Sequence, residues 1–73
     1  MKTTLKNKEL NMYLTKKNKS QNWLAYHLKI SSGYMSQLMN GARHPSPKMR
    51  ERIMKALPEL IFDDLFLVIE ENL

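Results

Sequence analysis

Cysteine is absent from the 73-residue sequence, which excludes disulfides and thiolate metal sites and fits a reducing cytoplasm. No apolar run approaches the roughly 18 residues that a membrane-spanning helix needs. The first residues, MKTTLKNKELN, contain no apolar signal stretch. We therefore expect a cytoplasmic, nucleoid-associated protein with no membrane partner. A chain this short buries only about 60% of the surface exposed when it is unfolded, so we expect a single domain, residues 1–73, with no small-molecule ligand.

Acids are nearly missing from residues 1–57, and bases are missing from residues 58–73. Residues 1–57 contain all 12 lysines and arginines and only two acids, Glu9 and Glu51, which gives a net charge of +10. Residues 58–73 contain five acids and no base, which gives −5. A basic body of this kind attracts polyanions, chiefly nucleic acid, through counterion release. A solvated basic surface without a partner explains the charge alone equally well.

Groups that carry enzymatic chemistry are also scarce. The sequence has only two glycines and no glycine-rich phosphate loop, and no serine, histidine and aspartate stand in a plausible catalytic arrangement. His27 and His44 have no acid or thiol partner at metal-ligand spacing. We therefore expect a protein that is not an enzyme and that has no metal and no cofactor.

Apolar residues recur at helical spacing almost throughout the chain. Ser20, either Ser31 or Ser32, and Ser46 are suitable N-caps, because a serine hydroxyl accepts a hydrogen bond from an unpaired N–H of the first turn. Gly41 suits a left-handed helix end, and Pro58 stops a helix. The sequence thus predicts an all-α, compact five-helix domain with helices at about 7–17, 21–29, 32–40, 47–57 and 63–72.

The two central helices are short and joined by a very tight turn. Leu24, Ala25 and Leu28 face inward on the first helix, and Met35 and Leu38 face inward on the second. The small side chain of Ala25 lets the two helices cross closely at a steep angle. This pattern predicts a helix-turn-helix at residues 21–40, whose second helix protrudes far enough to enter a major groove.

The stretch SQNWLAYHLKISSGYMSQLMNGARHPSPKMRERIMKAL resembles the Cro/phage-repressor (XRE-like) helix-turn-helix DNA-binding family. The matches begin with Ser20-Gln21, Leu24-Ala25 and Leu28, and continue through Ile30-Ser31 in the turn, Met35, Leu38, Asn40-Gly41, Pro45-Ser46-Pro47, Ile53, Ala56-Leu57 and Asp64-Leu65-Phe66. The resemblance covers residues 7–67 and implies a lambda-repressor-like fold. The sequence departs from the family at Lys29, where glycine is usual, at Lys19, which replaces an apolar residue, and at Pro58, which replaces a helix-ending glycine.

The resemblance also implies which residues contact DNA. The residues opening the second helix of the motif would contact bases, with Gln37 the best base reader because its amide can bond both N6 and N7 of adenine. Gln21 would hydrogen-bond a phosphate at a positive helix end. The full expected sets are Ser32, Gly33, Tyr34, Ser36 and Gln37 for bases, and Gln21, Ser31, Asn40, Arg43, His44 and Lys48 for phosphates.

These features predict a sequence-specific transcriptional regulator, a phage-type or mobile-element repressor that binds a palindromic operator on double-stranded DNA as a homodimer. The alternative is a protein-interaction module, antitoxin-like or antirepressor-like, that binds a partner protein through its last helix. That helix, about 63–72, contains both acidic and apolar residues. Leu65, Ile69 and Leu73 recur at a spacing of four residues and would form one apolar stripe. The expected interface set is Phe62, Phe66, Ile69 and Leu73. Trp23 is expected to pack on Tyr13 or the last helix, with a protein interface as the alternative.

Overall fold

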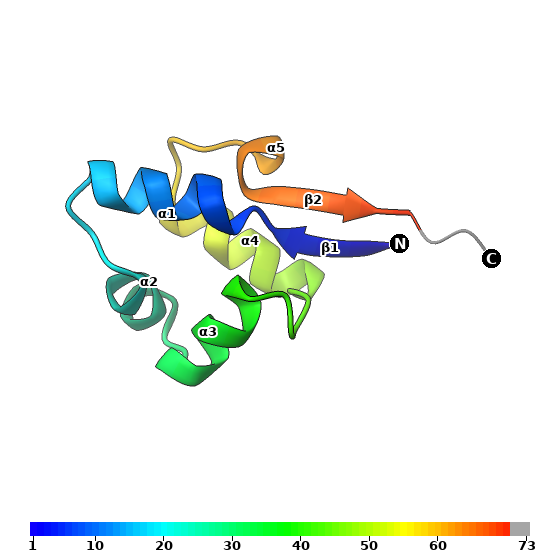
Figure 1. Ribbon diagram of the computed structural model, residues 1–73, viewed down its shortest axis with the longest axis horizontal. Helices are drawn as coiled ribbons and strands as arrows, with labels where there is room; N and C mark the ends of the chain where they lie inside the picture. The colour runs from blue at the N-terminus through cyan, green and yellow to red at the C-terminus, as the bar shows by residue number, and fades with distance from the viewer. Residues whose placement is uncertain (71–73) are drawn as a thin grey trace.

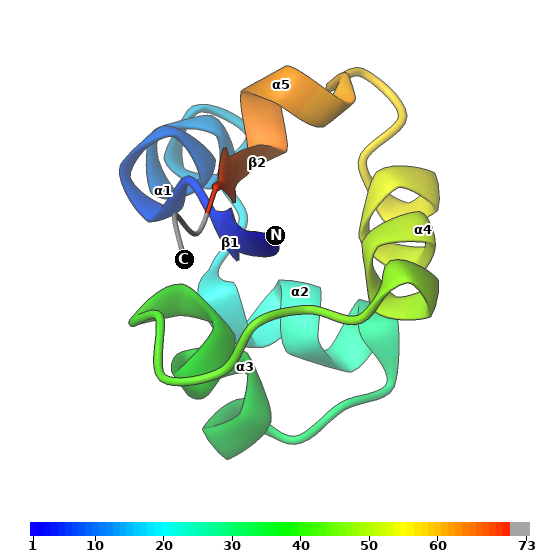
Figure 2. The same cartoon turned by 90° about the vertical axis from the view of Figure 1, so that its right-hand side faces the viewer.

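The computed structural model describes residues 1–70 and shows a helical body with a short antiparallel sheet (Figure 1). The domain has a Cα radius of gyration of 11.8 Å and measures 41 × 23 × 20 Å. Viewed along the sheet, the helices are arranged around it, with the second and third on one side (Figure 2). In chain order the elements are β1 (Lys2–Leu5), α1 (Asn7–Lys16), α2 (Gln21–Leu28), α3 (Ser32–Met39), α4 (Pro47–Ala56), α5 (Phe62–Leu65) and β2 (Phe66–Ile69).

Three of the helices begin at serine N-caps, as the sequence predicts. The Oγ atoms of Ser20, Ser31 and Ser46 accept hydrogen bonds from the N–H groups three residues later, at 3.0, 3.0 and 3.1 Å. Gly41, just after α3, has a φ of 81°, which confirms the expected left-handed end. The first four predicted helices are therefore confirmed to within one or two residues, because local side chains determine where they begin and end.

One hydrophobic core joins all of these elements. The inward residues of the helix-turn-helix are buried as expected, and Leu24, Met35 and Leu38 are completely inaccessible to solvent. The remaining core side chains come from both ends of the chain and from the other helices: Leu5, Leu10, Leu14, Ala25, Leu28, Met39, Met49, Ile53, Leu57, Leu65 and Phe66. The N-terminal strand and the last segment thus belong to the same packing unit as α2 and α3.

The prediction of an all-α fold is wrong, and so is the last helix at about 63–72. The helix α5 ends at Leu65, and the next four residues form β2, which pairs antiparallel with β1 in the register Leu5 to Phe66 and Lys2 to Ile69. The run Phe-Leu-Val-Ile is aromatic and β-branched, which favours a pleated strand over a helix. The segment therefore pairs with residues that no local pattern could identify as its partner.

The sheet closes the domain's own core where it meets the helices. The N–H of Lys6 donates to the Leu65 carbonyl oxygen at 2.8 Å and extends the pairing by one residue. Phe66 is only 2% exposed, and its ring packs against that of Phe62 with centroids 5.0 Å apart. Among residues 1–70, every helix is too short or too polar to cross a membrane.

Candidate nucleic-acid interface

The turn between α2 and α3 consists of residues 29–31. Lys29 takes the left-handed conformation, with φ 60° and ψ 42°, and its N–H donates to the Tyr26 carbonyl oxygen at 3.1 Å. The Ile30 N–H then donates to the Ala25 carbonyl oxygen at 3.0 Å. The lysine therefore adopts the backbone geometry that glycine adopts most readily, and the turn keeps its tight shape without one.

The helix α3 is held at both ends and along its inner side. Its start is capped by Ser31, and at its end the side-chain amide of Asn7 donates to the Met39 carbonyl oxygen at 2.9 Å. The N–H of Arg43 returns from the following loop to the Gln37 carbonyl oxygen at 3.1 Å. Figure 1 shows α2 almost end-on and α3 running across the view at the edge of the molecule, so the two helices are steeply inclined. This arrangement presents the outer side of α3 as a fixed surface.

Four of the five expected base-contacting residues lie on that outer side. Ser32, Gly33, Ser36 and Gln37 are all exposed. Within residues 1–70 the side-chain amide of Gln37 makes no hydrogen bond, so its donor and acceptor are free to meet the edge of a base. The exposed side of α3 therefore carries short, uncharged side chains, which suits base recognition rather than general attraction to phosphate.

Tyr34 differs from the other four. Its side chain is half-buried against the core, and the guanidinium of Arg43 lies 5.1 Å from its ring centroid. This contact is a cation–π interaction, and it holds Arg43 beside the start of α3. The structure thus joins a residue expected at the bases to one expected at the phosphates, a pairing that the sequence did not reveal.

Gly33 has no structural need to be glycine. Its φ is not positive, and a β-carbon built on it would meet nothing closer than the Ser31 Oγ at 4.0 Å. The space over Gly33 is therefore open to solvent on the exposed side of α3. The fold therefore does not require a glycine at position 33, and a larger side chain there would lie on the outer surface of α3.

The expected phosphate-contacting residues lie around the two ends of α3 and at the start of α2 and α4. Gln21 is half-buried at the first residue of α2, and the Ser31 hydroxyl is already used as a cap. The Asn40 Oδ1 accepts from the Ala42 N–H at 2.9 Å and shapes the loop that follows α3. Lys48 is exposed in the first turn of α4.

His44 belongs to a different environment from the other candidates. It lines a hollow of about 520 Å³ between the loop that follows α3 and the sheet, together with Thr3, Pro45 and Val68. Arg50 also lines this hollow, and its Nη1 donates to the Pro45 carbonyl oxygen at 3.3 Å. His44 therefore adjoins the sheet as well as the loop.

The expected dimer or partner interface is only partly exposed. Phe66 is buried in the core, Phe62 is half-buried, Ile69 is 40% exposed, and Leu73 lies outside the described residues. The most exposed apolar residue of this segment, Leu67 at 52%, was not recognised from the sequence, and Val68, at 45%, lies outside the expected interface set. The four-residue apolar run contained that signal, because alternate side chains of a strand point to opposite faces.

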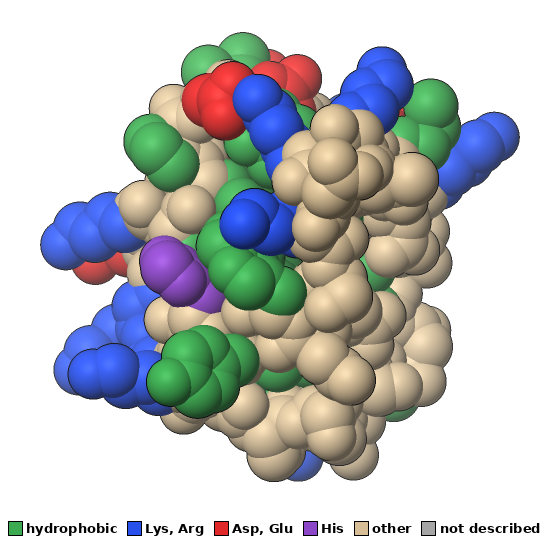
Figure 3. Space-filling view, turned by 90° about the vertical axis from the view of Figure 1, so that its left-hand side faces the viewer, with side chains coloured by type: hydrophobic (Ala, Val, Ile, Leu, Met, Phe, Trp, Pro, Cys, Tyr) green, Lys and Arg blue, Asp and Glu red, His purple; other side chains and the backbone are tan. Residues whose placement is uncertain are grey.

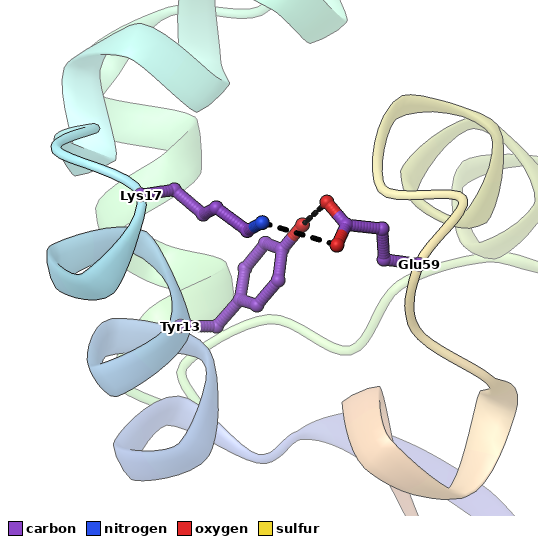
Figure 4. Close-up of polar contacts among 3 residues, drawn as sticks. All are labelled: Tyr13, Lys17 and Glu59. Carbon is purple, nitrogen blue, oxygen red and sulfur yellow. Dashed lines mark hydrogen bonds and ion pairs between the residues drawn. The ribbon is translucent and has the colours of Figure 1, made fainter.

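A polar cluster joins the end of α1 to the segment after α4 (Figure 4). The Tyr13 hydroxyl donates to Glu59 Oε1 at 2.9 Å, and Lys17 Nζ lies 3.1 Å from Glu59 Oε2. The hydrogen bond from Lys17, followed by the one from Tyr13, lowers the pKa of the Glu59 carboxyl below its usual 4.5. The hydrogen bond to Glu59 in turn raises the pKa of the Lys17 ammonium and of the Tyr13 hydroxyl.

Trp23 packs against the core from α2, as expected, and borders the same hollow as Tyr13. Its indole stacks on the imidazole of His27 with centroids 4.8 Å apart, and Lys19 Nζ lies 5.0 Å from the indole centroid. These groups are on α2 and the segment before it, and none belongs to α3.

Comparison with known proteins adds no relative: no protein-family model matches the chain, and no curated protein or solved structure is significantly similar to it. The function is therefore inferred from the chain's own residues and their geometry. That geometry brings together a rigid, exposed α3 with uncharged side chains and a set of cations and amides around its ends.

Proposed function

We propose that this protein is a sequence-specific DNA-binding transcriptional regulator, of the phage-type repressor kind, that places α3 in the major groove. The observation that carries the proposal is the fixed outer side of α3, where Ser32, Ser36 and Gln37 are exposed and uncharged. A helix whose ends are anchored by Ser31 and Asn7 loses little freedom when it binds. The protein then acts by occupying an operator and carries out no reaction.

Gln37 is the residue to which we assign base recognition. Its free amide can donate from the NH₂ group to N7 of adenine and accept at the carbonyl oxygen from the N6 amino group, because adenine presents an acceptor and a donor side by side. Because Arg43 is held against Tyr34 at 5.1 Å, its guanidinium lies beside the start of α3 and would contact the phosphates flanking the bases read by Gln37.

Lys48 supports a phosphate contact for an electrostatic reason. It lies in the first turn of α4, where the helix dipole disfavours a cation and favours an anion, and that turn contains no acid. A phosphate bound there would meet both the lysine and the backbone N–H groups. An otherwise unfavourable placement thus becomes favourable when DNA is bound.

We further propose that the regulator is a homodimer that joins through β2. Within residues 1–70 this strand pairs with β1 on one edge and with no strand on the other, and Leu67 and Ile69 project from the same face while remaining about half exposed. A second copy would cover these side chains and pair the open edge, giving the two-fold symmetry that a palindromic operator requires. Leu67→Lys is expected to give a monomer by analytical ultracentrifugation, whereas Ile61→Lys, which changes an exposed isoleucine outside the sheet, is expected to leave the dimer intact.

Selection from random duplex DNA at about 0.15 M salt, where unspecific phosphate binding is weakened, tests the function directly. We expect an inverted repeat to be enriched. On that site Gln37→Ala is expected to weaken binding by about 1–3 kcal/mol and to relax the preference at one base pair of each half-site. Asn22→Ala, at an exposed polar residue of α2, is the matched control and is expected to change neither. Folded protein that enriches no sequence would contradict the proposal.

The salt dependence of operator binding tests which cations take part. If Arg43 and Lys48 are the contacting cations of each protomer, the slope of log K against log salt is about −2 per protomer, since each neutralised phosphate contributes about −0.9. A slope near −9 per protomer would mean that almost the whole basic charge of residues 1–57 faces DNA, and would contradict the placement of α3 described here.

A protein-interaction module is the second candidate, and the exposed Leu67, Val68 and Ile69 favour it. In that case β2 would bind a different protein rather than a second copy. The protein would then be a monomer in isolation and would enrich no operator in the selection.

A further inference from the structure

Two adjoining hollows lie at the end of the molecule opposite the chain termini (Figure 3). The first, of about 180 Å³, is bordered by Tyr13, Trp23 and Pro58 with Leu14 and Leu57 of the core. The second, of about 360 Å³, is bordered by Leu28 and by four residues that carry polar heads: His27, Lys29, Arg52 and Lys55. Ala56 borders both hollows.

The stacked rings of Trp23 and His27 stand between the two hollows, because Trp23 borders the first and His27 the second. The first hollow is lined mainly by apolar and aromatic side chains, with Lys17, Lys19 and Glu59 also at its border, and the second is mainly cationic; one side chain of α4 is common to both. No residue of α3 borders either hollow, so this surface is separate from the one we assign to DNA. We call it the α2–α4 face.

The charges on the α2–α4 face are almost all positive. Lys17, Lys19, Lys29, Arg52 and Lys55 border the hollows, against the single acid Glu59. Glu59 is already bound to Lys17 and Tyr13, and Arg52 Nη2 donates to the Leu28 carbonyl oxygen at the end of α2. Within residues 1–70 no ion pair forms with Lys19, Lys29 or Lys55. Figure 3 shows hydrophobic side chains near the centre of this face and lysines and arginines around them.

We propose that the α2–α4 face binds an acidic peptide segment of a partner protein, with one apolar side chain in the Tyr13–Trp23 hollow and carboxylates beside Lys29 and Lys55. The excess of cations favours an anionic ligand, and the largely apolar lining of the first hollow favours one that also carries a hydrophobic group. The volume of about 180 Å³ is smaller than the roughly 300 Å³ at which pockets for whole small molecules begin, and it suits a single side chain.

A nucleic acid fits this face less well than a peptide. Bases bind such surfaces by stacking on an aromatic ring that is free. Here the indole of Trp23 is already occupied by the imidazole of His27 at 4.8 Å and by the Lys19 ammonium at 5.0 Å. The partner we infer is therefore a protein, and it can bind while α3 occupies DNA.

The test uses the full ¹⁵N-labelled chain and a short synthetic peptide in which glutamates flank one leucine, followed by amide chemical-shift mapping. We expect shifts at residues bordering the two hollows and none on the outer side of α3. Replacing the leucine of the peptide by serine is expected to weaken binding by about tenfold, the loss of one apolar anchor worth about 1.4 kcal/mol. Loss of the shifts with the serine peptide and their persistence with the leucine peptide would identify the apolar hollow as the anchor site.

Charge-reversing variants test the cationic part. Lys55→Glu and Lys19→Glu are expected to weaken peptide binding by about tenfold each. Lys8→Glu, the same change at an exposed residue of α1 away from both hollows, is expected to leave peptide binding unchanged. Operator affinity should be the same in Lys55→Glu as in the unmodified chain, so that loss of peptide binding is distinguished from loss of DNA binding.

Three results would overturn the proposal. One is the absence of peptide shifts on the α2–α4 face. Another is equal weakening by Lys8→Glu, which would mean unspecific charge attraction. The third is tighter binding of oligothymidylate than of the peptide at the same residues, which would make the face a single-strand binding surface instead.

Discussion

The two glycines of the sequence have opposite structural requirements, and exchanging each for alanine tests the description of α3. Gly33 is the second residue of α3, has an ordinary helical φ, and has open space where a β-carbon would lie. A glycine within a helix costs about 0.5–1 kcal/mol relative to alanine, so Gly33→Ala is expected to stabilise the protein by about 0.5 kcal/mol at this near-terminal position. Gly41 has a φ of 81°, and alanine there is expected to destabilise by about 1 kcal/mol although nothing lies within 4 Å of the new β-carbon.

Thermal unfolding followed by far-ultraviolet circular dichroism measures both effects. For a domain of this size about 1 kcal/mol shifts the Tm by roughly 4–8 °C, so Gly33→Ala should raise the Tm by a few degrees and Gly41→Ala should lower it by more. Destabilisation by Gly33→Ala, or no effect of Gly41→Ala, would refute the assigned backbone geometry. We interpret Gly33 as a neutral spacer and expect operator affinity to be unchanged in Gly33→Ala. A loss of affinity in this more stable variant would show that DNA occupies the open space.

Three further changes test the turn, the core and the polar cluster. Lys29→Gly is expected to raise the free energy of unfolding by about 0.5–1 kcal/mol, because glycine adopts φ 60° without strain, whereas Lys29→Ala should bring no such gain in urea denaturation. Ile53→Ala, which empties a fully buried site, is expected to cost about 2–5 kcal/mol, against about 0.5–1.5 kcal/mol for Ile53→Val; equal effects would contradict the tight packing. Glu59→Gln is expected to destabilise at neutral pH and progressively less as the pH falls below 4.5. The pKa of Glu59 is lowered in the folded protein, so its stabilisation is fully present above 4.5 and is lost as acid protonates the carboxylate; a difference that does not shrink with falling pH would contradict this.

The first four helices could be predicted from the sequence because their boundaries depend on neighbouring residues. Each serine cap bonds an N–H three residues away, and Gly41 ends α3 within its own turn. Inward residues such as Leu24 and Leu38 recur at helical spacing, and the helix-turn-helix follows from two such segments and a short connection.

The sheet could not be predicted in the same way. Leu65, Ile69 and Leu73 recur at helical spacing, and the same segment contains the strand-like run of residues 66–69, so the local pattern supports both structures. Whether residues 66–69 form a strand or a helix depends on the pairing between Leu5 and Phe66, two residues at opposite ends of the chain. A contact across so large a separation leaves no periodic signal in either segment.

One part of the candidate DNA surface could likewise be predicted from the sequence, and the other part could not. The positions of Gln37 and its neighbours on α3 follow from the motif, whereas the Asn7 bond to Met39 and the Arg43 contact with Tyr34 join residues that only the folded chain brings together. The α2–α4 face was not predicted at all, because its lining comes from α1, α2, α4 and the segment after α4.

The net charge of residues 1–57 does not tell how many cations face DNA, because the folded protein distributes them over different surfaces. Arg43 and Lys48 lie around α3, whereas Lys19, Lys29 and Lys55 border the α2–α4 face, so the total of +10 does not count the contacts with DNA. The outer side of α3 itself carries no charge, and hydrogen bonds from Gln37 to a base depend little on salt. Attraction to phosphate and choice of sequence therefore reside in different side chains. A change at Arg43 should alter the salt slope for every DNA sequence, whereas a change at Gln37 should alter the preference among sequences and leave the slope as it was.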